Sequence, residues 1–189
     1  FYNVNQASAI TTAGQFIIQY VEEKVNKYVN DILQTKDKID YIVASDTDSI
    51  YLCLDKLVEK FCKDKTKEQK LNFVDKVAKG KIEPFIEKCF EEIASYTNAF
   101  QQKMVMKREV IADKGIWTAK KRYMLNVLDE EGFRFEEPKL KIMGIEAVKS
   151  STPEVCRIAI KEAIRLIMNK DEDALHNYIS DFKETYKKY

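Results

Sequence analysis

The sequence has few of the residues that build structural metal sites and covalent cross-links. Among its 189 residues there is one histidine, His176, which sits in a polar helical pattern and is expected at the surface. The four cysteines show neither CxxC nor CxxH spacing, which argues against a zinc site. We expect them to be reduced thiols, as in a cytosolic protein. They are Cys53, Cys62, Cys89 and Cys156.

Long apolar runs and a strong net charge are also missing. No run approaches the ~20 residues that cross a bilayer, and the first residues lack a signal-peptide pattern, so we expect a cytoplasmic protein with no membrane partner. The formal net charge of +1 excludes a polybasic tail but allows a local basic face. With 45% hydrophobic and 33% charged residues, the chain can form one large or two small domains.

Two long helices are predicted in the first hundred residues. Apolar residues recur at helical spacing over residues 16–32, with charged residues mostly on the other face. A second helical pattern covers about residues 68–98, where Gly80 and Pro84 predict a kink or a break.

Strand patterns follow, and then only helical ones. Short strands are predicted at 104–106, 110–112, around Trp117, at 123–128 and at 133–135, with the last two joined by a turn. After residue 144 the sequence predicts only helix. The expected fold is therefore α+β, with an antiparallel sheet packed on two long helices and an all-helical segment after it.

The strongest chemical signal is the stretch 42–52, Ile-Val-Ala-Ser-Asp-Thr-Asp-Ser-Ile-Tyr-Leu. Two apolar runs flank a tight turn, which predicts a buried β-hairpin with Asp46 and Asp48 at its tip. Carboxylates this close raise one another's pKa unless a cation meets them. Mg²⁺ binds one or two carboxylates together with water and phosphates, so the pair predicts a magnesium site. An ordinary Asp- and Ser-containing turn explains the same residues without a metal.

A basic segment lies at residues 114–123, with four basic residues and no acid. Strand alternation would place Lys120 and Arg122 on one side and Lys121 and Tyr123 on the other. Basic side chains beside an aromatic ring on a strand suit a grip on a phosphate backbone. A solvated basic face is the plainer interpretation.

A second basic segment alternates Lys139 and Lys141 and leads to Lys149 and the hydroxyl-rich residues 150–152. A helix that begins there would offer free N–H groups to a phosphate. Lysines that guard an edge strand, followed by an ordinary helix cap, explain it equally well. Glu109 is a candidate acid in support of a metal site, although an exposed strand glutamate is the simpler interpretation.

Taken in this order, the segments resemble family B DNA polymerases, in particular the replicative polymerases of large tailed bacteriophages. The hairpin at 41–54 is similar to the family's motif C hairpin, and 120–123 to its Lys-x-Arg-Tyr primer-gripping motif. The resemblance covers essentially the whole chain. The other matching segments are Phe1-Tyr2, Ala9-Ile10-Thr11-Thr12, Gly14-Gln15, Met106, Arg108-Glu109, residues 137–144 and residues 149–153.

This resemblance implies a role for each segment. Residues 1–144 would be the later part of the palm, and residues 145–189 the first helices of the thumb. Asp48 would be the principal Mg²⁺ ligand and Asp46 a weaker one. The residues that shape or support this site would be Thr47, Ser49 and Glu109. The residues that hold primer–template DNA would be Lys120, Lys121, Arg122, Tyr123, Lys139 and Lys149.

The chain departs from the family pattern in several places. Ser45 stands where the family commonly has Gly, Lys107 where it has an acid, and the loop at 112–117 is short. The family's other metal aspartate, its fingers helix and its exonuclease carboxylates have no match. We therefore expect the chain alone to be inactive. It would be a piece of a longer polymerase or the C-terminal partner of a split one, since it opens on Phe1.

The implied partners are DNA, dNTPs, the remaining polymerase segment with its exonuclease, palm and fingers, and a sliding clamp bound through a C-terminus not included here. One alternative is a non-catalytic DNA-binding subunit. Another is a phosphatase or glycosyltransferase with an Asp-x-Asp metal site. Those folds need parallel βαβ units, whereas here the return strand follows the turn at once.

Overall fold

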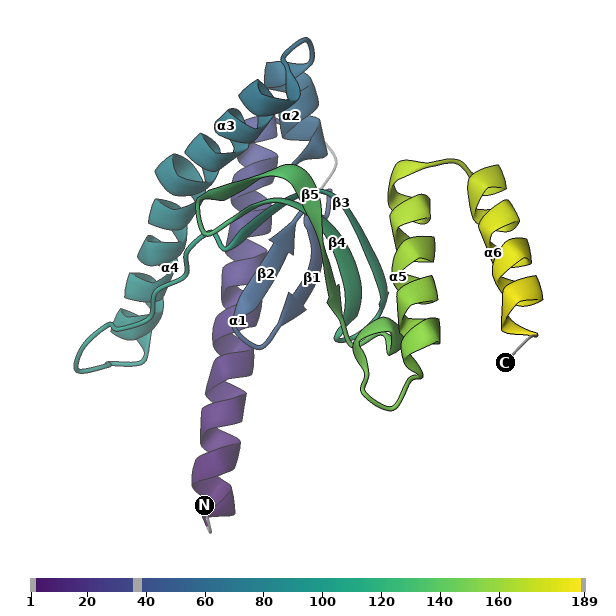
Figure 1. Cartoon of the computed structure of the whole chain (residues 1–189). Helices are drawn as coiled ribbons and strands as arrows, with labels where there is room; N and C mark the ends of the chain where they lie inside the picture. The colour runs from purple at the N-terminus through teal and green to yellow at the C-terminus, as the bar shows by residue number, and fades with distance from the viewer. Residues whose placement is uncertain (1–2, 36–38, 188–189) are drawn as a thin grey trace. The chain divides into compact units, whose positions relative to one another are not determined.

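The computed structural model describes residues 3–35 and 39–187, so that Phe1 and Tyr2 of the matching segments lie outside the described residues. The fold is α+β, as predicted, with helices and two antiparallel sheets (Figure 1). The chain divides into two compact units, Phe1–Glu109 and Val110–Tyr189. Each is described by itself.

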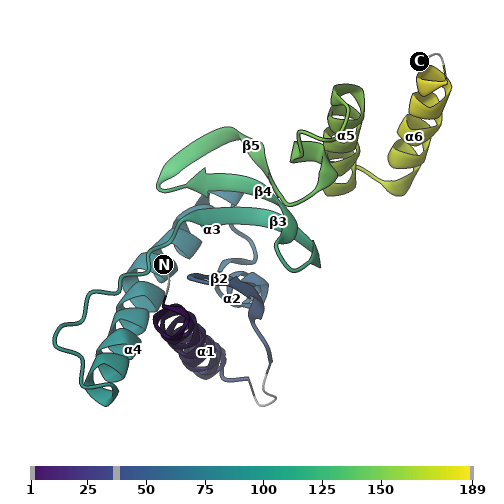
Figure 2. The same ribbon diagram turned by 90° about the horizontal axis from the view of Figure 1, so that it is seen from below.

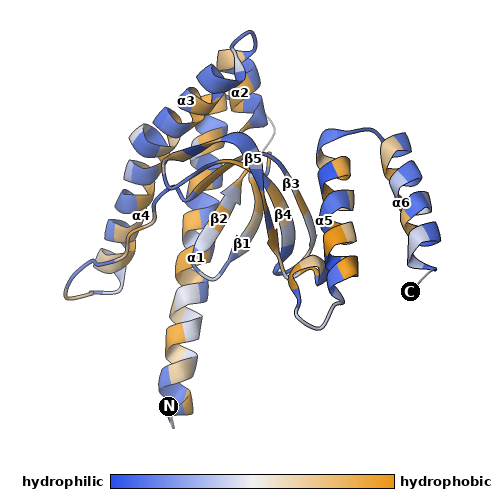
Figure 3. Ribbon diagram, in the orientation of Figure 1, coloured by the Kyte–Doolittle hydropathy of each residue, from blue (hydrophilic) through white to orange (hydrophobic). Residues whose placement is uncertain are grey.

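The first unit is built on the 30-residue helix α1 (Val4–Leu33), which confirms the first predicted helix and begins earlier than expected. Asn3 caps its N-terminus by accepting a hydrogen bond from the backbone N–H of Gln6 at 3.2 Å. Apolar residues occur along the N-terminal half of the helix (Figure 3). Two of them, Val4 and Ile10, are exposed. The buried residues of α1 are Val21, Val25, Val29 and Leu33.

The second predicted long helix is confirmed together with its irregularity. After α2 (Asp55–Cys62), helix α3 (Lys67–Val77) passes through the π-helical turn η1 (Ala78–Ile82) into α4 (Glu83–Tyr96). The π turn contains Gly80 and Pro84 follows it in the first turn of α4, which is where the kink was predicted. Helices α1 and α4 lie side by side (Figure 2), and the rings of Tyr28 and Phe85 stack between them at 4.1 Å.

Strands β1 (Ile42–Asp46) and β2 (Ser49–Leu52) form the predicted hairpin as a separate two-stranded sheet. Ile42, Ile50 and Leu52 pack on the core that α1 and α4 share. The strands are half-buried rather than buried, because only one face meets that core and a bulge turns Val43 outward, where it is 50% exposed.

Two asparagines of α1 anchor the chain that leads into β1. The Asn26 side chain accepts a hydrogen bond from the backbone N–H of Tyr41 at 2.8 Å. The Asn30 side chain donates to the carbonyl of Ile39 at 2.8 Å and accepts from its N–H at 3.1 Å. The position of the hairpin is thus set by the helix beneath it.

Asn30→Ala should destabilise the first unit by about 2 kcal/mol, because both backbone groups of Ile39 lose their partner. Urea unfolding should show this loss, and amide hydrogen exchange should become faster at Ile39. The matched control is Asn5→Ala on the exposed end of α1, where the expected change is within about 0.5 kcal/mol. Equal stability of the two variants would show that Asn30 is not an anchor.

The second unit is a three-stranded antiparallel sheet followed by helices. Strands β3 (Val110–Ala119), β4 (Arg122–Glu130) and β5 (Phe133–Met143) are neighbours in chain order. The 3₁₀ turn η2 (Glu146–Val148) leads to α5 (Glu154–Asn169) and α6 (Glu172–Tyr186). A buried cluster joins the sheet to α5, and its residues are Met124, Ile145, Ala147, Ile164 and Met168.

Two details of the predicted strands are wrong. Residues 104–106 form no strand, and their apolar alternation instead reflects the packing of Met104 and Met106 on the first unit's core. Residues 112–117 are not a loop but part of β3. At Gly115 a side chain would overlap the ring of Trp117, so that this glycine lets the ring lie across the strand.

The predicted absences can be compared only with the described residues. Among these, no helix is long and apolar enough to cross a membrane. All four cysteines are free thiols, with Cys62 and Cys89 buried and Cys53 and Cys156 half-buried.

Candidate metal and nucleic-acid site

The hairpin tip is a tight turn held together by Asp46. Thr47 and Asp48 make the turn, with Thr47 in the left-handed conformation at φ 53°. The Asp48 N–H donates to the Asp46 carbonyl at 2.6 Å. The Thr47 hydroxyl donates to the Asp46 carboxylate at 3.0 Å, and the Ser49 hydroxyl to the Asp46 carbonyl at 3.1 Å. Both hydroxyls therefore stabilise the turn and orient Asp46.

The two carboxylates differ in how open they are. Asp46 is half-buried and engaged with Thr47, whereas Asp48 is exposed. Within residues 3–35 and 39–187, the Asp48 side chain makes no hydrogen bond or ion pair. Asp48 can thus meet a cation without first breaking a contact.

The donor set fits one side of a hard-metal site. In the described ranges no three His, Cys, Asp or Glu side chains come together as a complete metal site. Mg²⁺ is commonly held by only one or two carboxylates together with water and phosphates. Asp46 and Asp48 can supply those carboxylates. Glu109 is exposed at the end of the first unit, and its predicted place beneath the metals stays a prediction.

Arg108, next to Glu109, ties the segment after α4 back to the helices. Its backbone N–H donates to the Glu83 carboxylate at 2.8 Å, and its guanidinium meets Asp75 at 2.7 Å. Lys79 pairs with the same Asp75 at 3.0 Å. Sequence reasoning did not identify Asp75 and Glu83, because the residue that joins them, Arg108, comes from a distant segment.

The basic motif does not alternate along a strand as predicted. Ala119 pairs with Arg122, so Lys120 and Lys121 form the two-residue turn between β3 and β4. Lys121 has a left-handed conformation with φ 61°. Arg122 and Tyr123 begin β4, and the Tyr123 ring lies 6.1 Å from that of Trp117. The two lysines project from the end of the sheet rather than from opposite faces.

Gly144 lies directly against this turn. It has φ 67°, and a methyl group on it would overlap the carbonyl oxygen of Lys121 and come within 3.1 Å of the Arg122 side chain. The end of β5 therefore supports the turn by close backbone contact. Residues 120–123 and 139–144, which were interpreted separately from the sequence, meet at this point.

An acid that sequence reasoning missed lies among the basic residues. Nη2 of Arg122 donates to both oxygens of Glu146, at 2.8 and 2.6 Å, and Lys149 donates to one of them at 2.9 Å. The hydrogen bond from Lys149, with the backbone and the charge of Arg122, lowers the pKa of Glu146 to about 2. Glu146 is therefore ionised throughout the neutral range. Its spacing of three residues from Lys149 was the available signal.

Lys139 lies apart from this group. It pairs with Glu130 at 2.6 Å and lies over the ring of Phe135 at 5.3 Å. The hydrogen bond from Lys139 lowers the pKa of Glu130. Since Met143 is opposite Tyr123, Lys139 is four residues, about 13 Å, farther along β5. The structure thus brings Lys149, but not Lys139, close to the turn of Lys120 and Lys121, which we call the Lys-Lys turn.

The predicted helix start at residues 150–152 is also displaced. Helix α5 begins at Glu154 with Pro153 as its N-cap, and no side chain caps it. The backbone N–H of Thr152 donates instead to the carbonyl of Lys149 at 3.2 Å. The hydroxyls of this segment therefore belong to a turn before the helix.

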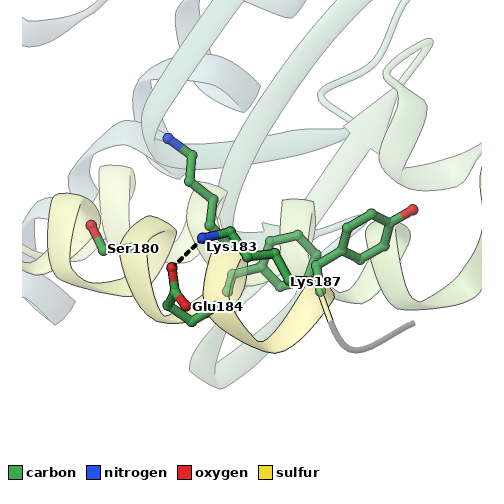
Figure 4. A pocket seen from close by; sticks show the side chains of 6 residues that line it. Ser180, Lys183, Glu184 and Lys187 are labelled. Carbon is green, nitrogen blue, oxygen red and sulfur yellow. Dashed lines mark hydrogen bonds and ion pairs between the residues drawn. The ribbon is translucent and has the colours of Figure 1, made fainter.

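Two surface hollows in the described part of the chain contain none of the predicted site residues. One lies on α6 beside Ser180, Lys183, Glu184 and Lys187 (Figure 4). The other lies between the end of α1 and α2, where Lys60 donates to the Leu33 carbonyl at 2.8 Å. Both are open features of helix surfaces.

Paired carboxylates on a hairpin and a turn of basic residues are the kinds of groups that a nucleotidyltransferase acting on nucleic acid uses. Comparison with known proteins identifies particular relatives. The chain is 42% identical over 197 aligned positions to the DNA-directed DNA polymerase of Enterobacteria phage T4. It is 44% identical over 182 positions to that of Escherichia phage RB69.

These alignments cover 99% and 91% of the chain. The chain spans about a fifth of the length of the two relatives, 22% and 20%. No protein-family model matches it. The chain is homologous to one segment of the phage DNA-directed DNA polymerases, which confirms the resemblance that its motifs indicated.

Proposed function

We propose that the chain is part of a DNA-directed DNA polymerase, in which it helps to add dNTPs to the 3′ end of a DNA primer. The observation that carries this proposal is the identity of more than 40% with two phage polymerases over nearly the whole chain. It acts together with the polymerase segments that the relatives have and this chain does not span. The setting is the cytoplasm of an infected host, with a sliding clamp as a further partner.

The two parts of the polymerase that we assign to the chain are the later palm and the start of the thumb. The strands end at Met143, and in the described residues up to 187 only helical elements follow, which supports a palm at residues 1–144 and a thumb at 145–189. The boundary falls inside the second compact unit, since the sheet and α5 share a core.

In this proposal Asp48 is the principal ligand of a divalent metal, Mg²⁺, and Asp46 a weaker one. Two such ions, when bound, lower the pKa of the primer 3′-hydroxyl and neutralise charge on the reacting phosphates. The chain's own contribution is orientation. Thr47 and Ser49 hold Asp46 in place by hydrogen bonds, and the turn leaves the Asp48 carboxylate open.

The Lys-Lys turn and its neighbours hold the primer strand. Arg122 and Lys149 meet at Glu146, and Lys120 and Lys121 directly precede Arg122 in the turn. Tyr123 adds a ring next to Arg122 in the chain. Contacts of this kind fix the position of a duplex without reading its sequence. We place Lys139 at the outer edge of this surface, because its partner is Glu130.

Lys121→Ala should weaken binding of a primer–template duplex by the same factor for every sequence. Loss of one phosphate contact should also reduce the slope of log affinity against log salt by about 0.9. Fluorescence anisotropy at several salt concentrations measures both quantities.

The control for this variant is Lys161→Ala, which removes the same charge from an exposed position on α5. It should change neither affinity nor slope by a comparable amount. If Lys121→Ala binds the duplex at low salt with the same affinity as the unaltered chain, Lys121 does not contact the primer strand.

The alternatives are distinguished by geometry and by assay. The phosphatase or glycosyltransferase alternative needs parallel strands, whereas every strand pair within the described residues is antiparallel. The non-catalytic DNA-binding subunit remains a distinct hypothesis. The deciding assay is primer extension after the chain is added to the remaining polymerase segments. It compares the unaltered chain with a chain in which Asp48 is replaced.

A further inference from the structure

Glu146 is an acid that lies among basic residues at one end of the sheet of the second unit. Arg122 reaches it from the start of β4 and Lys149 from the end of η2, at 2.6 to 2.9 Å. The Lys-Lys turn is joined to the same place, because Lys121 precedes Arg122 and rests against Gly144. Two positive charges thus bind one negative charge, and two further lysines belong to the adjoining turn.

The pairing of Arg122 with Glu146 uses only part of the guanidinium. Both hydrogen bonds come from Nη2, whereas a carboxylate in the favoured two-pronged arrangement takes one bond from each of two nitrogens. Nε of Arg122 is buried and has no hydrogen-bond partner among the described residues. Glu146 therefore engages Arg122 through one nitrogen only.

The pair is also accessible to a competing anion. The side chains of Arg122, Glu146 and Lys149 are 41%, 45% and 45% exposed. Ion pairs this exposed are weak in water, because solvent screens them and both side chains lose freedom. A phosphate oxygen accepts hydrogen bonds from guanidinium and ammonium groups as a carboxylate oxygen does.

We propose that Glu146 occupies the place of a backbone phosphate in the DNA-free protein and yields Arg122 and Lys149 to that phosphate when DNA binds. The inference rests on the proposed function and deepens it, since it names the acid that sets the strength of the grip. Glu146 keeps the two cations gathered while the site is empty. In exchange it lowers the affinity for DNA, because one negative charge must be displaced.

A role as a simple support makes the opposite prediction. If Glu146 only held Arg122 and Lys149 in their binding positions, its removal would disperse them and weaken DNA binding. If it competes with phosphate, its removal strengthens binding. The sign of the change in affinity therefore separates the two roles.

The test is Glu146→Gln, which keeps the size of the side chain and removes its charge. The full chain is titrated into a fluorescent primer–template duplex over a range of NaCl concentrations. We expect affinity at low salt to rise about three- to tenfold. The reason is that repulsion between the Glu146 carboxylate and a nearby DNA phosphate costs ~1 kcal/mol in water. The slope against log salt should steepen by about one, since the freed cations displace more counterions.

The control is Glu162→Gln on α5, whose carboxylate pairs with Arg165 at 3.1 Å and is 42% exposed. This variant makes the same change in net charge at a similarly exposed glutamate that lies outside the proposed grip. It should therefore alter affinity less than about twofold. In an Arg122→Ala background the gain from Glu146→Gln should shrink, because one of the cations that it frees is no longer present.

The outcomes are distinguishable. If the unaltered chain does not bind the duplex even at low salt, the proposed grip itself fails. If it binds, and Glu146→Gln binds no better than Glu162→Gln or binds more weakly, the competing role of Glu146 is overturned. Thermal unfolding of each variant excludes a loss of folded protein as the cause.

Discussion

Asp48→Asn should abolish primer extension by the completed polymerase while leaving the fold intact. Loss of the carboxylate removes the principal metal ligand, and we expect a decrease of about a thousandfold or more in the rate. The free energy of unfolding should change by less than about 0.5 kcal/mol. The reason is that the Asp48 side chain is exposed and makes no contact in the described part of the chain that the turn depends on.

The assay combines the chain with a polypeptide that supplies the polymerase segments it does not span, and follows extension of a labelled primer. Asp64→Asn is the matched control, because Asp64 is an exposed aspartate of the same unit far along the chain from the hairpin. Extension that is restored equally by the unaltered chain and by Asp48→Asn would contradict the catalytic role. The chain would then be a DNA-binding subunit.

Gly144→Ala should unfold or strongly destabilise the second unit, by about 3 kcal/mol or more. Two effects add. An alanine at φ 67° is strained, and its methyl group overlaps the Lys121 carbonyl. The clash is with backbone rather than with a movable side chain, so relief requires β5 or the Lys-Lys turn to shift.

The single tryptophan, Trp117, lies on β3 and reports unfolding of the second unit by its fluorescence. Gly132→Ala separates the two effects, because Gly132 has φ 92° but open space where a side chain would go. We expect that variant to lose only about 1 kcal/mol. Equal losses at both positions would mean that the contact between Gly144 and the turn is unimportant.

The parts of the fold that could be predicted from the sequence are those that local periodicity determines. Helix α1, the kinked helix from α3 to α4 and the hairpin at Asp46 and Asp48 all follow from the spacing of apolar residues and from Gly80 and Pro84. The single sheet that we expected is two, because apolar alternation identifies strands without saying which strands pair.

The turn at Lys120 and Lys121 could not be predicted, because it lacks the Gly or Asn that usually marks a left-handed position. Its reason lies just after β5, where Gly144 allows the backbone to approach. Long-range partners also explain why Asn30 and Glu146 were missed. Each is an unremarkable polar residue in sequence, and its importance comes from the atoms that folding brings to it.

Lys114, on the strand that enters the Lys-Lys turn, donates a hydrogen bond to the carbonyl of Met168 near the end of α5. Together with the apolar cluster of the second unit, this bond links α5 to β3. A rotation of α5 must therefore also displace the end of β3, where the turn of Lys120 and Lys121 begins. The position of α5 and the position of that turn would then change together.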